Sequence, residues 1–230
     1  MNTKKNISKI SPAKKLTGQV GTNAHFSKIE LAKQALEQND PLAAIDICNA
    51  ILKRDKNADI SLQIASIAYN KIHKRDKAIE YIRAALKINP TSPNHINTLA
   101  NYLVDDDDLV QAEHLYKEAI NLDPSYFDPR FNLGRLFIKC ARYEEAETCF
   151  QHCLPLAPTN ARVYQNIGVC LFNSGRPAKS IHWFTLAHHF DPTAGDVLVN
   201  LALAHAESYL FEKALSFYEK ALDADPEQHE

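Results

Sequence analysis

The sequence of 230 residues lacks the features that mark several classes of protein. No apolar run approaches the ~20 residues that a membrane-spanning helix needs, and the first residues lack the apolar segment of a secretory signal peptide. Neither a glycine-rich phosphate-binding loop nor a Ser-His-Asp arrangement with supporting motifs is present. We therefore expect no membrane span, no cofactor and no enzymatic activity.

The net charge and the cysteine content argue against two further classes, nucleic-acid-binding proteins and disulfide-rich proteins. The net charge is only −2, whereas a nucleic-acid-binding domain usually carries a basic face. The five cysteines are scattered and odd in number, which favours reduced thiols in a cytoplasmic protein over a disulfide framework. Cys149, His152 and Cys153 have the residue types of a zinc site, but Cys153 occupies a small core position, so we predict no metal site.

What the sequence does contain is a repeat. Five prolines follow one another at intervals of 34 residues: Pro90, Pro124, Pro158, Pro192 and Pro226. A fixed period of this length indicates stacked repeats. Counting back from the prolines divides the chain into six units, 25–58, 59–92, 93–126, 127–160, 161–194 and 195–228.

Each unit has the pattern of two helices. Apolar residues recur at three- and four-residue spacing, and the proline falls where it would end the second helix. The eighth position is always small, namely Ala32, Ser66, Ala100, Gly134, Gly168 and Ala202. The twenty-fourth position is medium or large and mostly aromatic, namely Cys48, Ile82, Tyr116, Phe150, Phe184 and Tyr218. We expect the small residues to let the helices approach and the aromatic rings to fill the space beside them.

These residues resemble the tetratricopeptide-repeat (TPR) family. The match is clearest in unit 127–160, with Leu133, Gly134, Phe137, Ala146, Phe150 and Pro158. The resemblance implies an all-α fold, a right-handed α-α superhelix (solenoid) of six helix-turn-helix repeats, and a role as a protein-protein interaction scaffold. The first unit departs most, with Lys56 in place of the proline, as terminal repeats often do.

In the family, the first helices of the units line a concave groove, and asparagines gather at the positions that face it. They are Asn97, Asn101, Asn132, Asn166 and Asn200, with Gln165 beside them. An amide offers a donor and an acceptor, which suits the backbone of an extended peptide. The arrangement resembles the asparagine ladder in the TPR superhelix of O-linked N-acetylglucosamine transferases. The alternative is that these amides serve neighbouring helices.

Basic residues cluster around these asparagines. They are Arg135, Lys139 and Arg162, and an arginine can grip a carboxylate with two hydrogen bonds. The expected partner is therefore a protein or peptide, acidic or with a free C-terminal carboxylate. The positions that form the carboxylate clamp of TPR co-chaperones lack two of its three basic residues here, so we do not predict that clamp.

The sequence predicts a scaffold that binds an extended peptide or a partner helix in its groove. The alternative is a substrate-docking arm of a larger enzyme, of glycosyltransferase or sulfotransferase type, whose catalytic domain is absent from this chain. Residues 1–24, rich in lysine and without acidic residues, are expected to form a disordered basic tail. The last unit leaves Leu215, Tyr218 and Leu222 uncovered, which indicates either a fragment of a longer protein or self-association.

Overall fold

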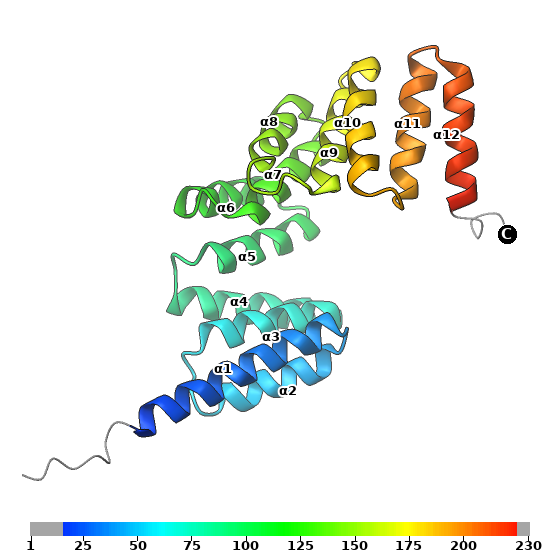
Figure 1. The fold of residues 1–230 in the computed structure, drawn as a ribbon. Coiled ribbons are helices and arrows are strands. Elements are labelled where there is room, and N and C mark those ends of the chain that lie inside the picture. Colours follow the sequence, from blue (N-terminus) through cyan, green and yellow to red (C-terminus); the bar gives the residue numbers. More distant parts are fainter. Residues whose placement is uncertain (1–15, 225–230) are drawn as a thin grey trace, which may run out of the picture. The chain divides into compact units, whose positions relative to one another are not determined.

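The computed structural model describes residues 16–224, which form α-helices and contain no strand (Figure 1). None of the described helices is both long and apolar enough to cross a membrane. The chain divides between Pro90 and Thr91 into an N-terminal unit and a C-terminal unit, each compact in itself.

In the N-terminal unit, the described residues 16–90 contain four helices packed in chain order. They are α1 (Leu16–Glu37), α2 (Pro41–Leu52), α3 (Asp59–Lys71) and α4 (Arg75–Ile88). The first helix begins at Leu16, so residues 16–24 are helical where the sequence analysis placed a disordered tail. Adding a residue to a helix that already exists supplies one hydrogen bond without a new nucleation cost, so a helix can extend past its packed part. The rest of the predicted tail, residues 1–15, lies outside the described residues.

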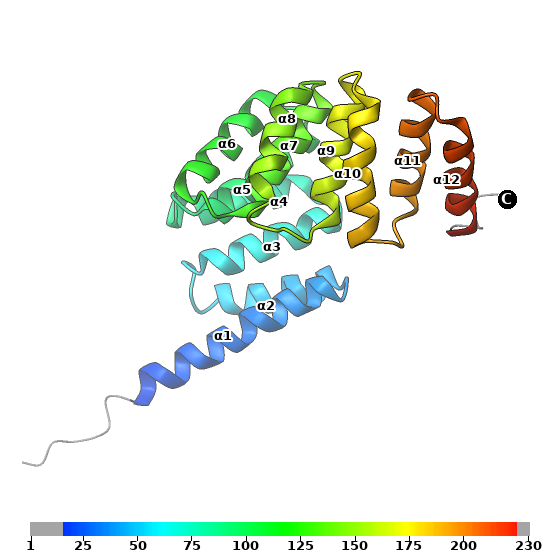
Figure 2. The same cartoon turned by 45° about the horizontal axis from the view of Figure 1, so that its top comes forward.

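Up to Ala224, where the description of the chain ends, the C-terminal unit contains eight helices, arranged as hairpins whose two members lie side by side (Figure 2). They are α5 (Pro93–Asp105), α6 (Leu109–Leu122), α7 (Phe127–Lys139), α8 (Tyr143–Cys153), α9 (Ala161–Asn173), α10 (Pro177–Phe190), α11 (Gly195–Glu207) and α12 (Phe211–Ala224). Each helix packs on the next, and α5, α7, α9 and α11 also contact one another in order. The expected all-α fold of stacked helix-turn-helix repeats is confirmed.

The repeated prolines end helices in the way that their chemistry requires. A residue before proline is disfavoured in the helical region, and Asn89, Asp123 and Asp191 have φ of −129°, −140° and −138°. The carboxylates of Asp123 and Asp191 accept hydrogen bonds from the backbone N–H groups of Ser125 and Thr193 at 3.0 and 3.1 Å. The two aspartates therefore stabilise the turns that follow α6 and α10.

The turn inside each hairpin has a second repeated feature. Its middle residue has a positive φ in all six hairpins: Asn39, His73, Asp107, Ala141, Gly175 and Tyr209, with φ between 56° and 73°. Glycine is the residue that adopts this region most readily, and only Gly175 is one. Asn39, His73 and Asp107 are also of types that favour this region. At Ala141 and Tyr209, by contrast, the turn is imposed by the packing of the two helices rather than by the residue type.

The core depends on close contact between small and aromatic residues. An added Cβ at Gly134 would lie 2.7 Å from Cζ of Phe150, and one at Gly168 would lie 2.5 Å from Cε1 of Phe184. Both rings are buried, with exposures of 0% and 1%. The predicted pairing of the eighth and twenty-fourth positions is therefore present in the structure, and it brings the two helices of a hairpin to within van der Waals contact.

We expect Gly168→Ala to lower the free energy of unfolding by about 1 kcal/mol, measured by urea denaturation. Overpacking costs about 1–3 kcal/mol, and the Phe184 ring has no exposed side toward which to move. This exceeds the gain in helix propensity of about 1 kcal/mol. Gly195→Ala is the matched control, because a Cβ there meets no atom within 4 Å. Equal stability of the Gly168 variant and the wild-type protein would contradict the close-contact account.

Candidate functional site

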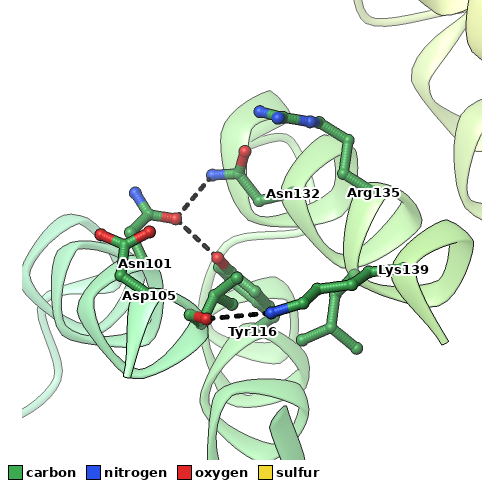
Figure 3. Close-up of a pocket in the computed structure, with 8 residues that line it drawn as sticks. Asn101, Asp105, Tyr116, Asn132, Arg135 and Lys139 are labelled. Carbon is green, nitrogen blue, oxygen red and sulfur yellow. Dashed lines mark hydrogen bonds between the residues drawn. The ribbon is translucent and has the colours of Figure 1, made fainter. Parts of the chain in front are cut away.

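A pocket of about 300 Å³ opens between α5, α6 and α7 of the C-terminal unit (Figure 3). Its walls are mostly polar and carry charges of both signs. The labelled side chains that line it are Asn101, Asp105, Tyr116, Asn132, Arg135 and Lys139. Four of these residues were predicted as groove residues from the sequence, namely Asn101, Asn132, Arg135 and Lys139.

Two asparagines of this pocket, Asn101 and Asn132, form a hydrogen-bonded cluster with Asn97 of α5. Asn132 Nδ2 donates to Asn97 Oδ1 over 3.2 Å and to Asn101 Oδ1 over 3.1 Å. Asn97 is buried, with 5% of its surface exposed. The amide donors of Asn132 are thus used to hold α7 against α5, and its oxygen points away from Asn101 (Figure 3). Here the asparagines serve neighbouring helices, as the alternative interpretation of the sequence stated.

Tyr116 of α6 completes this amide cluster. Its hydroxyl donates to Asn101 Oδ1 over 2.6 Å, and only 2% of the residue is exposed. Burial raises the pKa of Tyr116 well above its ordinary range, and the nearby Asp105 carboxylate raises it further. The hydroxyl therefore remains a donor at all physiological pH values.

From the repeat pattern, Tyr116 is predicted only as a core aromatic residue. The available signal was its hydroxyl, because Phe150 and Phe184 occupy the same position in the next two repeats. A buried hydroxyl needs a hydrogen-bond partner, so a tyrosine among phenylalanines indicates a polar group on the facing helix. In this repeat the partner is Asn101.

The three basic residues predicted for the groove, namely Arg135, Lys139 and Arg162, differ in their contacts. Lys139 Nζ lies 2.8 Å from Asp107 Oδ1 and also donates to the backbone oxygen of Val104. Arg162 stacks its guanidinium over the Phe131 ring, with Cζ 5.4 Å from the ring centroid. Phe131 and Arg135 are four residues apart on α7 and share a face. The two guanidinium groups therefore flank the same face of α7, and the salt bridges found among the described residues include neither of them.

The amides of α9 and α11 do not continue the cluster. Asn166 Nδ2 donates to the backbone oxygen of Arg162 on its own helix over 2.7 Å. Gln165 Nε2 donates to Asp196 Oδ2 of α11 over 2.7 Å, and Asn200 lies half-buried on α11. The amides predicted as one ladder thus fall into a linked group on α5 and α7 and separate groups on α9 and α11.

Protein-family models described as tetratricopeptide repeat match residues 58–92, 103–167 and 195–228. Among curated proteins, anaphase-promoting complex subunit 6 of Arabidopsis thaliana is 30% identical over 121 residues, which are 49% of this chain and 22% of that protein. The chain spans between 22% and 40% of the length of the first three curated relatives that it matches.

Solved structures share the fold. PilW, a widely conserved type IV pilus biogenesis factor, has a TM-score of 0.79 at 18% identity, over 87% of this chain and 93% of its own. YrrB, described as a TPR protein with an unusual peptide-binding site, has a TM-score of 0.64 at 20% identity, over 78% of this chain and 92% of its own. At these identities the likeness shows the fold alone.

The Tyr116 hydroxyl donates a hydrogen bond to Asn101, so removing this hydroxyl should destabilise the protein. We expect Tyr116→Phe to lower the free energy of unfolding by about 1 kcal/mol, the usual net value of one hydrogen bond. Asn101 Oδ1 keeps its bond from Asn132, which limits the loss. Tyr209→Phe is the matched control, because Tyr209 is 82% exposed and the same change should be within about 0.5 kcal/mol of neutral. If the two variants have the same unfolding midpoint, the hydrogen bond from Tyr116 to Asn101 does not stabilise the fold.

Proposed function

Because this chain belongs to the tetratricopeptide-repeat family, we propose that it binds an extended segment of a partner protein across the wall formed by α5, α7, α9 and α11. The family and its fold support a protein-interaction role. YrrB, which has the same fold, is described as having a peptide-binding site. The wall is continuous within the C-terminal unit, because each of the four helices contacts the next one in this set.

The two guanidinium groups of Arg135 and Arg162 carry this proposal. They flank one face of α7, and neither takes part in the salt bridges found among the residues that the structure describes. A guanidinium forms two parallel hydrogen bonds with a carboxylate, so the complementary group is an acidic side chain or a C-terminal carboxylate. Lys139 contributes less, because Asp107 already neutralises it.

The amides have two different roles in this proposal. The cluster of Asn97, Asn101 and Asn132 fixes the distance between α5 and α7 and presents the Asn132 oxygen as an acceptor for a backbone N–H. Gln165, Asn166 and Asn200 then lie further along the same wall. Preorganised polar groups of this kind reduce the cost of ordering on binding.

Other expectations from the sequence stay predictions. They are the cytoplasmic location, the role as a docking arm of a larger enzyme, and self-association through the exposed residues Leu215 and Leu222. All five cysteines are free, which supports a reducing compartment.

The proposal predicts that partner binding depends on the two arginines. We expect the double variant Arg135→Gln and Arg162→Gln to bind a partner isolated with the wild-type chain at least about tenfold more weakly, because losing charge-assisted bonds costs more than about 1.4 kcal/mol. The measurement is a titration of that partner by isothermal calorimetry. These changes test binding more cleanly than Asn132→Ala, because Asn132 also holds two helices together.

Arg54→Gln with Arg83→Gln is the matched control, since both of these arginines are exposed and lie in the N-terminal unit. It removes the same charge from the chain and should leave the affinity unchanged. Equal affinities for the wild-type chain and for the double variant at positions 135 and 162 would place the binding surface elsewhere.

A further inference from the structure

A second pocket, of about 240 Å³, lies in the N-terminal unit, where the end of α2 meets α3 and α4. It is lined by Leu52, Lys56, Leu62, Glu80, Tyr81 and Ala84. Leu52, Leu62 and Ala84 give it an apolar surface, whereas the exposed side chains of Lys56 and Glu80 place charges of both signs at its rim. No part of this pocket belongs to the wall formed by α5, α7, α9 and α11.

The repeat provides a filled counterpart of this pocket in the C-terminal unit. Three periods of 34 residues after Leu62 and Tyr81 stand Tyr164 and Trp183. The centroid of the Tyr164 ring lies 6.1 Å from that of Trp183 and 5.0 Å from that of Phe190. In that repeat, an aromatic ring therefore takes the place that is a pocket in the N-terminal unit.

The backbone is alike in the two repeats, so the difference lies in the side chains. Asp55 and its counterpart Ala157 each donate a backbone N–H to the oxygen four residues earlier, over 2.9 and 3.0 Å. Three side chains of the N-terminal unit are smaller than their counterparts: Leu62 against Tyr164, Ala84 against Leu186, and Ile88 against Phe190. Tyr81 does not close the pocket, because its ring packs on Tyr69 of α3, with centroids 5.1 Å apart.

The size of the pocket suits one side chain better than a free metabolite. Sites for small molecules usually measure about 300–1,000 Å³, whereas an apolar cavity of about 150 Å³ already holds one benzene ring. A pocket of about 240 Å³ therefore has room for a single aromatic ring with a polar end.

We infer that this pocket binds a tyrosine or tryptophan side chain of a partner protein. The Tyr164 hydroxyl donates to the Pro158 oxygen over 2.7 Å, and the Lys56 oxygen holds the same repeat position as that acceptor. A hydroxyl or indole N–H in the pocket has this oxygen and the Glu80 carboxylate as acceptors, and an ammonium such as that of Lys56 attracts the face of a ring. The inference goes beyond the proposed function, because it needs neither the wall nor its arginines.

The ring has to come from another molecule. Residues 1–15 and 225–230, outside the described structure, contain no Phe, Tyr or Trp. Tryptophan and tyrosine are enriched among the side chains that anchor protein interfaces in pockets, which favours a partner protein. The alternative source is a second copy of this chain, in which Tyr209 is 82% exposed.

The test is a titration of the whole chain, with ¹³C-labelled Leu and Ala methyl groups, with the peptide Ac-Gly-Gly-Trp-Gly-Gly-NH₂. We expect a Kd on the order of 1 mM and ring-current shifts of the methyl signals of Leu52, Leu62 and Ala84. The methyl signals of Leu122, which is 43% exposed on α6, should not shift. The same peptide with Leu in place of Trp should bind at least about fivefold more weakly.

Filling the pocket from within should abolish binding. Leu62→Tyr reproduces the repeat that contains Tyr164, so it should remove the shift of Leu52 and raise the urea midpoint of unfolding. Val110→Tyr is the matched control, because Val110 is 84% exposed on α6; it should bind the Trp peptide as the wild-type chain does. Ala84→Leu fills the pocket from α4, and it replaces Leu62→Tyr if circular dichroism shows that the latter perturbs the fold.

Three results would overturn the inference. The first is that the Trp peptide leaves the Leu52 and Ala84 signals unshifted or binds no more tightly than the Leu peptide. The second is that the shifts persist in both filled variants. The third is that the Leu52 and Ala84 signals shift when the chain alone is concentrated and stay fixed in Tyr209→Ser, which would make the occupant a second copy. None of these results bears on the arginines of the wall, so the proposed function is tested separately.

Discussion

The contact between a glycine of one helix and a buried phenylalanine of its partner is the constraint on which the two central hairpins of the C-terminal unit, α7–α8 and α9–α10, depend. Gly134 and Gly168 leave no room for a Cβ beside the rings of Phe150 and Phe184. This contact draws the two helices of a hairpin together, and the repeated hairpins then place α5, α7, α9 and α11 next to one another. The wall on which the functional proposal rests is a consequence of that packing.

The polar side chains of the wall are of two kinds. Some form hydrogen bonds that hold neighbouring helices together, and others carry charge that the fold does not use. Asn97, Asn101, Asn132 and Tyr116 satisfy one another, so their polar atoms stabilise the interface of α5 with α7. Arg135 and Arg162 add positive charge and take part in none of the salt bridges found in the described part of the chain. A buried polar network is costly unless each member is satisfied, whereas exposed charges cost little until a partner arrives. This difference separates structural residues from candidate binding residues.

The sequence alone predicts the fold well and the site in part. The period of the prolines and the pairing of small with aromatic positions predict which residues form the helices and the core. They do so because core contacts join residues that are close in the sequence and recur at the same positions of each repeat. Side-chain hydrogen bonds on the wall are less predictable, since an asparagine can bond across helices, as Asn132 does, or to its own helix, as Asn166 does. The same residue type at the same repeat position has different partners because its neighbours differ.

The central claim is that a partner occupies the wall of first helices, and side-chain NMR of the chain with an isolated partner tests it most directly. The account predicts that signals of the Arg135 and Arg162 guanidinium groups and of the Gln165 and Asn200 side-chain amides shift on binding. Signals of the exposed residues Val110 and Leu122 on α6 should not shift. Shifts confined to Val110, Leu122 and the other second-helix residues would contradict the account.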